Sequence, residues 1–257
     1  MSRYDQLLNQ LHSRPKATEK PTLARMRTLM HRLGDPQDRL RFIHITGTNG
    51  KGSTAAFTAS VLRETGQKIG LFTSPFLANF RERFQINGVM ISKAEFSDFA
   101  EQVLQAEADT GVGPINEFEF VTAVGFCWFA AQCCSWVVLE AGMGGRDDPT
   151  NIITTSVCCC ITKISLDHTA LLGSTVAAIA ENKAGILRAG IPLVTPCSQV
   201  PAALEVLQQV AKRHHAPLTV TAKPQQYDCR PDGSHMLYGT LKLDIPLPGA
   251  HQLENTA

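Results

Sequence analysis

The sequence predicts an α/β protein built on a mainly parallel, doubly wound sheet. Short apolar strand candidates alternate with segments of helical periodicity along most of the chain. Several of these strands, such as 136–140 (WVVLE) and 157–164, are apolar throughout, which is typical of strands covered on both faces. The polar residues that could carry chemistry come directly after strand candidates, where ligands bind in such sheets.

The individual elements follow from local patterns. The first 35 residues are expected to be helical, because Leu23, Met26, Met30 and Leu33 recur at helical spacing. Asn116 and Glu119 form a capping-box pattern at the start of another helix. Residues 74–92 show no period and are predicted to be a long functional loop. The remaining predictions are strands at 41–46, 68–73, 136–140, 157–164, 191–195 and 218–220, helices at 54–66, 93–108, 117–134 and 200–214, and a β-hairpin or edge ribbon at 236–247.

Composition excludes several classes of protein. With 257 residues, the chain is long enough for one large domain or for one and a fraction. A charged fraction of 18% and a hydrophobic fraction of 44% argue against intrinsic disorder. The net charge of +1 offers no basic surface for nucleic acid or for an anionic membrane. No apolar run reaches the ~18–20 residues that would span a bilayer, and the N-terminus lacks the apolar core of a signal peptide.

The eight cysteines do not form a disulfide or zinc pattern. Three are adjacent at 158–160, two are adjacent at 133–134, and no C-x-x-C pair occurs. A metal site at the triplet is rejected, because adjacent strand residues point to opposite faces. We therefore expect buried thiols that pack as small apolar groups in a reducing, cytoplasmic compartment.

The sharpest motif lies between strand 41–46 and the following helix. It reads Gly47-Thr48-Asn49-Gly50-Lys51-Gly52-Ser53. Glycines allow backbone N–H groups to approach phosphate oxygens, and the helix N-terminus adds its positive end. Lys51 would neutralise the β- and γ-phosphates, and the Ser53 hydroxyl would reach Mg²⁺. The spacing departs from G-x-x-x-x-G-K-[ST], since Gly52 stands between the lysine and the serine.

Three further polar residues follow strands or begin helices. Glu140 ends strand 136–140 and would face the phosphate crevice, where it could hold Mg²⁺ directly or through water. His168 follows Asp167 after the cysteine-rich strand, and a single histidine is more often structural than a ligand. Lys183 lies in a helix that begins near Thr175, where the ordinary interpretation of a lysine is a solvated surface side chain.

The chain resembles the folylpolyglutamate synthase/dihydrofolate synthase family of the Mur ligase superfamily over nearly its whole length. The matching stretches are LHSRP (11–15), HITGTNGKGS (44–53), GLFTSPFLANFRERFQING (70–88), FEFVTA (118–123), VLEAGMGGRDDPTN (138–151), ISLDHTALLG (164–173), ENKAGIL (181–187) and LPGAHQLEN (247–255).

The resemblance implies ATP and two Mg²⁺ ions as cofactors, with catalytic roles for Lys51, His168 and Lys183. It implies that Lys183 is carbamylated and binds the second Mg²⁺ together with His168. The first Mg²⁺ would be held by Ser53, Ser74 and Glu140. ATP would be contacted by Thr48, Asn49, Gly50, Lys51, Gly52, Ser53, Thr54, His251, Gln252 and Asn255. At 182 the family's usual acid is replaced by asparagine, which leaves the surroundings of Lys183 open.

On the substrate side, residues 74–88 correspond to the family's mobile loop beside the pterin or folate pocket. Pro75 and Phe76 would border the pteridine, and Phe76 replaces the family's usual histidine. The resemblance assigns substrate binding to Pro75, Phe76, Arg81, Arg83, Asp148, Thr150 and Asn151. From the residues alone, the Arg81–Arg83 cluster would either hold the loop, meet an acidic substrate or form a solvated charge run. Asp147 stands where the family usually has leucine.

The domains expected from the resemblance are an ATP-binding central domain at 1–248 and the start of an inter-domain helix at 249–257. The family's smaller C-terminal glutamate-binding domain would be missing, so the chain is interpreted as a fragment or a truncated form. A complete short enzyme is disfavoured, because domain closure excludes water from the reaction.

Three functions remain as expectations. The first is an ATP-dependent ligase that joins L-glutamate to dihydropteroate, a folate or a folylpolyglutamate through an acyl phosphate, acting as a monomer without nucleic acid or membrane partners. The second is a chain that binds nucleotide or folate but is not catalytically competent alone. The third is another Mur-type ligase acting on a cell-wall precursor, which SPFLANFRERFQING argues against. A hydrolase triad is weak, since no G-x-S-x-G motif is present. The sequence leaves open whether the synthase would make dihydrofolate, polyglutamates or both.

Overall fold

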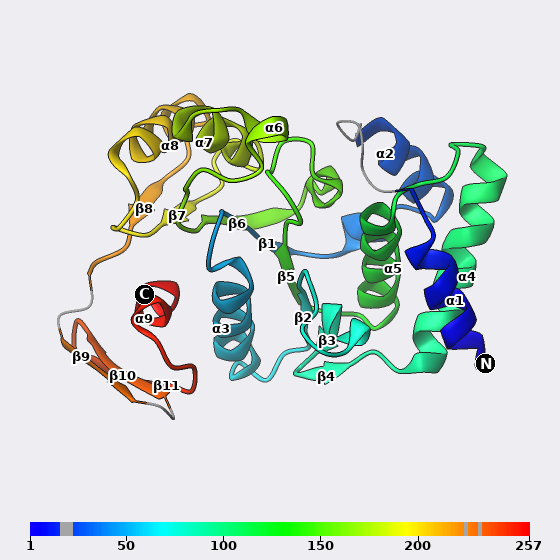
Figure 1. Ribbon diagram of the computed structural model, residues 1–257, viewed down its shortest axis with the longest axis horizontal. Helices are drawn as coiled ribbons and strands as arrows, with labels where there is room; N and C mark the ends of the chain where they lie inside the picture. Colours follow the sequence, from blue (N-terminus) through cyan, green and yellow to red (C-terminus); the bar gives the residue numbers. More distant parts are fainter. Residues whose placement is uncertain (16–22, 224–225, 231–232) are drawn as a thin grey trace. The chain divides into compact units, whose positions relative to one another are not determined.

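The computed structural model describes residues 1–15, 23–223, 226–230 and 233–257 (Figure 1). Contacts divide the chain into two compact units. Unit 1 comprises Met1–Ile43, Ala59–Met143 and Asp147–Ser156, and unit 2 comprises His44–Thr58, Gly144–Arg146 and Val157–Ala257. Each unit is described by itself below. The predicted domain boundary at residue 248 stays a prediction.

The central feature is a mostly parallel sheet of eight strands in the order β4-β3-β2-β5-β1-β6-β7-β8. The pairs β2/β5, β6/β7 and β7/β8 are parallel, whereas β2/β3 and β3/β4 are antiparallel. The predicted fold class is therefore confirmed, with an antiparallel edge added. The strands are β1 (Phe42–Thr46), β2 (Ile69–Phe72), β3 (Phe84–Ile86), β4 (Val89–Met90), β5 (Trp136–Glu140), β6 (Ser156–Ile161), β7 (Leu193–Thr195) and β8 (Leu218–Val220).

The antiparallel edge corrects the prediction of one long loop at 74–92. Only the first part of that segment is irregular, since β3 and β4 form a hairpin in which Ile86 is opposite Val89. The connection is Asn87-Gly88, and both residues have positive φ angles, 49° and 82°. Asn-Gly favours such a two-residue turn, so the signal was present in the sequence and was missed.

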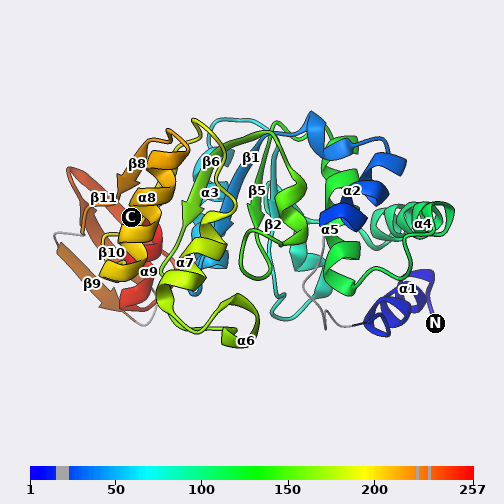
Figure 2. The same cartoon turned by 90° about the horizontal axis from the view of Figure 1, so that it is seen from above.

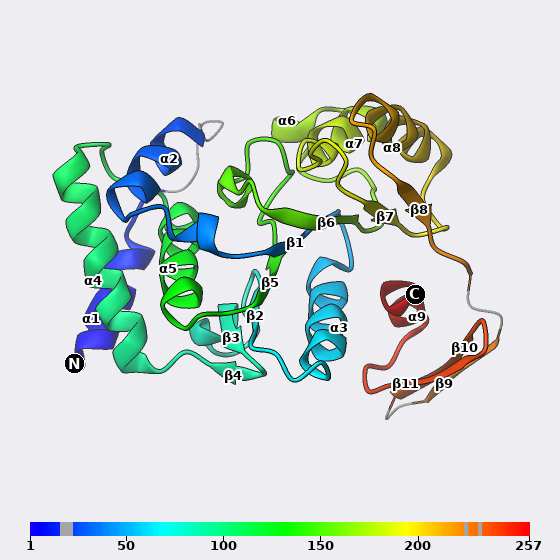
Figure 3. The same ribbon diagram turned by 180° about the vertical axis from the view of Figure 1, so that it is seen from behind.

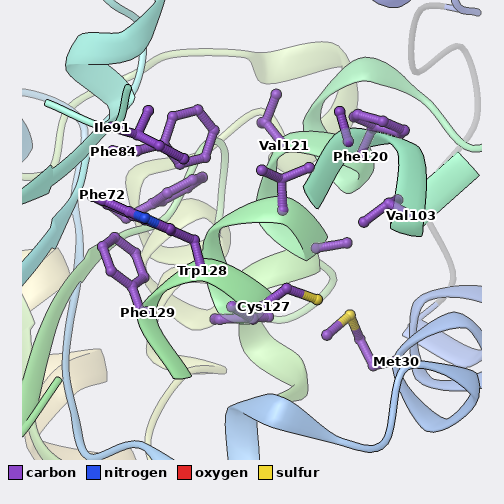
Figure 4. Close-up of a cluster of buried hydrophobic side chains, with 14 of the residues drawn as sticks. Met30, Phe72, Phe84, Ile91, Val103, Phe120, Val121, Cys127, Trp128 and Phe129 are labelled. Atoms are coloured by element: carbon purple, nitrogen blue, oxygen red, sulfur yellow. The ribbon is translucent and has the colours of Figure 1, made fainter. Parts of the chain in front are cut away.

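In unit 1 the helix α5 (Glu117–Ala131) lies on the sheet through close contacts between small and aromatic residues, and the other helices pack against it. These helices are α1 (Arg3–His12), α2 (Leu23–Arg32), α4 (Lys93–Thr110) and α5 (Glu117–Ala131), shown from above in Figure 2. A Cβ on Gly70 of β2 would approach the ring of Phe129 to 2.8 Å, so glycine lets α5 lie directly on the strand. Figure 4 shows the resulting aromatic core, in which the rings of Phe72 and Phe84 meet edge to face at 5.6 Å. The predicted capping box of Asn116 and Glu119 is present at the start of α5.

Unit 2 has its own apolar core beneath α7 (Val176–Ala184) and α8 (Pro201–Arg213). A separate antiparallel sheet, β9 (Gln226–Arg230), β10 (Gly233–Tyr238) and β11 (Leu241–Ile245), packs against the short helix α9 (Ala250–Thr256), as Figure 3 shows. The predicted hairpin is β10–β11, and β9 was not predicted. The helix α3 (Lys51–Arg63) begins in unit 2 directly after the glycine-rich loop.

The cysteine side chains follow the prediction in part. The seven whose side chains are described are free thiols. Burial raises the pKa of Cys127, Cys134, Cys159 and Cys160 to about 12, so these thiols stay protonated and pack as apolar groups. Cys133 and Cys197 are exposed, against the expectation of burial. In the described part of the chain, no helix has the length and apolar character needed to cross a membrane.

We expect His44 in β1 to make the stability of the protein depend on pH. Its side chain is fully buried, and burial, with the nearby positive charge of Arg188, lowers its pKa from 6.5 to about 3. The unfolded chain binds a proton between these values that the folded chain does not, so the contribution is complete above pH 6.5 and is lost as the pH falls towards 3. The loss should approach about 1.4 kcal/mol per pH unit.

Urea unfolding at a series of pH values, with wild type compared to His44→Gln, measures this contribution. The difference in unfolding free energy between the two should shrink as the solution is acidified below pH 6.5. A constant difference would show that His44 is protonated in the folded protein.

Candidate functional site

The glycine-rich loop of unit 2 has a shape that only glycine permits at two positions. Gly47 and Gly50 have φ angles of 151° and 87°. A Cβ at Gly47 would lie 2.9 Å from the Cβ of Thr162, and one at Gly50 would lie 2.9 Å from the Cγ of Asn255. These clashes keep the positions free of side chains, and α3 begins at Lys51 at the end of the loop. The loop therefore presents backbone N–H groups at a helix N-terminus, as an anion site requires.

The glycine-rich loop is also held in place by hydrogen bonds to the segment that follows β6. The N–H groups of Thr48 and Asn49 donate to the carbonyl oxygen of Lys163 at 2.9 and 3.3 Å. The Thr48 hydroxyl donates to the carbonyl of Ser165, and the Thr162 hydroxyl donates to the carbonyl of Asn49. Four contacts to the segment after β6 fix the loop before any ligand binds, which is the preorganisation that phosphate recognition needs.

Two lysines meet at one carbonyl oxygen of this loop. Lys183 Nζ donates to the Gly47 oxygen at 2.7 Å, and Lys51 Nζ donates to the same oxygen at 3.2 Å. Lys183 is only 3% exposed, so the ordinary interpretation of a solvated surface lysine is wrong. Two ammonium groups this close repel each other, and an anion between them would relieve the repulsion.

Asn182 holds the turn that lies against Lys183. Its side-chain oxygen accepts from the N–H of Gly145 at 3.0 Å, and its carbonyl accepts from the N–H of Arg146 at 2.9 Å. A Cβ at Gly145 would approach the Lys183 carbonyl to 2.6 Å. The sequence marked Asn182 only as a departure from the family pattern. The structure shows it to be a positioning residue, which required knowing that the Gly144–Arg146 turn packs on α7.

His168 takes a different position from the lysines. It has a positive φ of 47° and precedes the short helix α6 (Thr169–Leu172). Its ring is about half exposed, and Nε2 lies 3.6 Å from the carboxylate of Asp167. The residue is thus accessible for a ligand, but none of its described contacts joins it to Lys51 or Lys183.

The helix α9 brings one of the three predicted nucleotide residues to the loop. Asn255 lies against Gly50, and its carbonyl accepts from the Thr54 hydroxyl at 3.2 Å. Gln252 accepts from the Asn255 side-chain amide at 2.9 Å and so orients it. His251 is exposed.

In unit 1 the ends of two neighbouring parallel strands bring together Ser74 and Glu140. Glu140 ends β5, and Ser74 follows β2, which pairs with β5. The Glu140 carboxylate is 3% exposed and accepts from the backbone N–H of Ser74 at 2.9 Å. Two of the three predicted ligands of the first Mg²⁺ are therefore adjacent, and the third, Ser53, lies in unit 2. Oxygen ligands of this kind suit Mg²⁺. Within the described residues, no three His, Cys, Asp or Glu side chains converge on a metal site.

The loop after Ser74 is organised by a single carboxylate. Glu82 accepts from the backbone N–H groups of Leu77, Ala78 and Asn79 at 2.8, 3.3 and 2.8 Å. These bonds, with that from Leu77 the largest cause, lower the pKa of Glu82. The sequence placed Glu82 only in a charge cluster. In the structure, the hydrogen bonds of Glu82 hold the backbone of residues 77–79 in place.

The two arginines of this cluster differ. Arg81 Nη1 donates to the carbonyl of Ile91 at 3.0 Å and thereby ties the loop to the edge hairpin. Arg83 is only 8% exposed, so the interpretation of a solvated charge run is wrong for it. Its guanidinium lies over the rings of Phe76 and Phe80, with its carbon 5.2 and 5.5 Å from the two centroids.

Asp148, Thr150 and Asn151 are buried at the start of a short 3₁₀ segment (Pro149–Ile152). The Asp148 carboxylate accepts from the N–H of Met143 and from both the N–H and the hydroxyl of Thr150. Burial raises the pKa of Asp148, and these hydrogen bonds oppose the rise. The observed contacts of Asp148 shape its own loop, and its predicted contact with substrate stays a prediction.

Known proteins resemble this chain in sequence and in structure. No family model matches the chain. The dihydrofolate synthase/folylpolyglutamate synthase of Bacillus subtilis is 43% identical over 218 residues, which cover 83% of this chain and 50% of that protein. The folylpolyglutamate synthase of Mycobacterium tuberculosis complexed with ADP superposes with a TM-score of 0.88 at 32% identity, covering 99% of this chain and 60% of that one.

A solved FPGS–AMPPCP–folate complex superposes with a TM-score of 0.91 at 35% identity, covering 98% of this chain and 64% of that one. The chain spans about half the length of the curated relatives it matches. With these similarities over nearly all of its own residues, the chain belongs to the folylpolyglutamate synthase/dihydrofolate synthase family.

Proposed function

We propose that the protein is an ATP- and Mg²⁺-dependent ligase that adds L-glutamate to dihydropteroate or to a folate. The preorganised glycine-rich loop with Lys51 at its Gly47 carbonyl carries the proposal, because it places a cation at a helix N-terminus where phosphate would bind. The relatives support the ligands, since one was solved with ADP and another with AMPPCP and folate.

In the proposed reaction, a carboxylate oxygen of the substrate attacks the γ-phosphorus of ATP, which gives an acyl phosphate and ADP. The amine of glutamate then attacks the acyl carbon, phosphate leaves, and the nitrogen loses a proton as the amide forms. The loop amides and Lys51 would stabilise the charge on the transferred group and hold the reactants in line. Thr48, Asn49, Gly50, Gly52, Ser53 and Thr54 would bind the phosphates, and His251, Gln252 and Asn255 the nucleoside.

Hydroxyl and carboxylate oxygens are ligands that Mg²⁺ prefers. Ser53, Ser74 and the buried carboxylate of Glu140 would hold the first ion, and His168 with Lys183 the second. When bound, these ions would neutralise the negative charge that develops on the transferred phosphoryl group. Lys183 can contribute only as an anion, so we propose its carbamylation. The structure supports this, because a carbamate would replace one of two mutually repelling ammonium groups by a negative charge.

The acid substrate would bind along unit 1. Pro75 and Phe76 would border the pteridine. Arg81 and Arg83 would hold the loop in place or contact the acidic substrate. The remaining substrate contacts would come from Asp148, Thr150 and Asn151. The protein would act as a monomer. A second candidate function is binding of nucleotide or folate without catalysis.

One experiment separates these functions. The 257-residue chain is titrated with ATP, with dihydropteroate and with a UDP-sugar peptide, each with and without Mg²⁺, and then incubated with ATP, dihydropteroate and labelled glutamate. We expect binding of ATP and dihydropteroate and none of the UDP-sugar peptide. Glutamate-dependent formation of ADP and labelled amide would establish the ligase, and binding without product would establish the second candidate. Failure to bind nucleotide would contradict both.

A further inference from the structure

Arg83 is a buried charge whose guanidinium makes no hydrogen bond to the described part of the chain. The residue is 8% exposed, and its Nε and Nη1 atoms have no hydrogen-bond partner among the described residues. The nearest carboxylate oxygen, Oε1 of Glu117, lies 3.7 Å from Nη2, which is longer than a hydrogen bond. Glu117 is itself shared with His12, whose Nδ1 lies 3.4 Å from Oε2. Buried polar groups in folded proteins are almost always paired, so the unpaired donors of Arg83 call for an acceptor that binds there.

The guanidinium is covered by two aromatic rings that differ in their freedom to move. Phe80 is 5% exposed and belongs to the core of unit 1. Phe76 is half-buried and belongs to the segment 75–78, where Leu77 is 94% exposed. This segment is attached mainly through the hydrogen bonds of its backbone to Glu82. Phe76 is therefore the part of the cover that a ligand can displace.

Arg83 also lies close to the strand end that carries the predicted metal ligands, because its carbonyl accepts from the N–H of Thr73 at 3.2 Å and the N–H of the next residue, Ser74, donates to Glu140 at 2.9 Å. Burial lowers the pKa of Arg83, and the charges of Glu117 and Glu140 oppose this shift. An anion that pairs with Arg83 would thus lie next to Glu140 and Ser74. Aromatic walls, a cation with unpaired donors and a neighbouring metal site together suit the carboxylate end of an aromatic acid.

We propose that Arg83 binds the reacting carboxylate of the acid substrate, and that Phe76 is a lid that covers Arg83 when no acid is bound. The assignment rests on the proposed function. It adds which end of the substrate the loop recognises and why the loop carries an aromatic residue at position 76.

The test compares two ligands of nearly the same shape, pteroate and its primary carboxamide, in which a neutral amide replaces the negative carboxylate. Their dissociation constants are measured for the wild-type chain, Arg83→Met and Arg83→Lys, together with that of ADP. We expect the wild type to bind the acid about 10- to 100-fold more tightly than the amide, as for a hydrogen bond to a charged group. Arg83→Met should bind both within about threefold of each other, and Arg83→Lys should recover part of the preference. The affinity for ADP should not change.

Stability separates a binding role from a structural one. Removing a buried charge that lacks hydrogen bonds to the described residues should leave the urea midpoint of Arg83→Met unchanged or raise it, because the desolvation cost of the charge is removed as well. Arg25→Met is the matched control, because Arg25 makes two hydrogen bonds to the buried carboxylate of Glu119. That variant should lower the midpoint and keep the preference for the acid.

Five outcomes contradict the proposal. Arg83 does not bind the carboxylate if the Arg83→Met variant still prefers the acid. The same follows if the affinity of this variant falls equally for the acid and the amide. A large fall in the urea midpoint of Arg83→Met would show that the guanidinium is structural. A wild type that binds both ligands equally would overturn the role of Arg83 and leave the proposed function standing. A wild type that binds neither would contradict the proposed function itself.

Discussion

Replacing Lys51 by methionine is expected to weaken binding of Mg²⁺·ATP by about 100-fold, within the range for a hydrogen bond to a charged group. Among the residues that the structure describes, Lys51 Nζ donates only to loop carbonyls, those of Gly47 and Thr48, both at 3.2 Å. These bonds exchange readily for a phosphate oxygen, which a charged amine prefers to a neutral carbonyl. Methionine keeps the unbranched chain and removes the charge, so the change tests the ammonium group rather than the packing.

Isothermal titration with ATP measures this effect, and Lys212→Met is the control. Lys212 is an exposed lysine on α8 in the same unit, so its loss changes the net charge equally without touching the loop. We expect its effect to stay within about threefold, as for a screened surface charge. Equal losses in the two variants would mean that overall charge, and not Lys51, attracts the nucleotide.

Replacing Lys183 by methionine is expected to reduce glutamate-dependent product formation by about 1,000-fold or more, the scale of losing a principal charge-stabilising group at the reacting centre. ATP should bind within about tenfold of wild type, because Lys51 and the loop amides remain. The loss of stability should stay at about 1.5–3 kcal/mol, since methionine fills the space of the side chain but removes its hydrogen bond to the Gly47 carbonyl.

A second measurement tests the carbamate directly and does not require turnover. Wild type equilibrated with ¹³C-bicarbonate should show a carbamate carbon signal that Lys183→Met lacks. Asn182→Ala, which loosens the turn beside Lys183, should weaken but not abolish this signal. If the wild type shows no carbamate signal, Lys183 acts as an ammonium ion. Normal product formation by Lys183→Met would remove the residue from the mechanism altogether.

Much of the fold was predictable because it is encoded locally. Strand β5 was predicted with its observed bounds, since an uninterrupted apolar run ending in an acid has few alternatives. The start of α5 was predicted from Asn116 and Glu119, which satisfy each other's backbone within one turn. The hairpin β3–β4 was missed because its strands have three and two residues, too short to show a period. Only the Asn87-Gly88 turn signalled it.

The sequence by itself determined the glycine-rich loop before α3 and the acid at the end of β5, because both depend on a few adjacent residues and on the strand before them. Only the tertiary structure decided which distant side chains join them. Lys183 is 136 residues from Gly47, and helical periodicity alone does not say that it points at that carbonyl. Arg83 is likewise buried by rings from its own loop and by the sheet edge, so its unpaired donors appear only once the chain has folded. Burial and pairing are properties of contacts between remote segments, and no local pattern in the sequence records them.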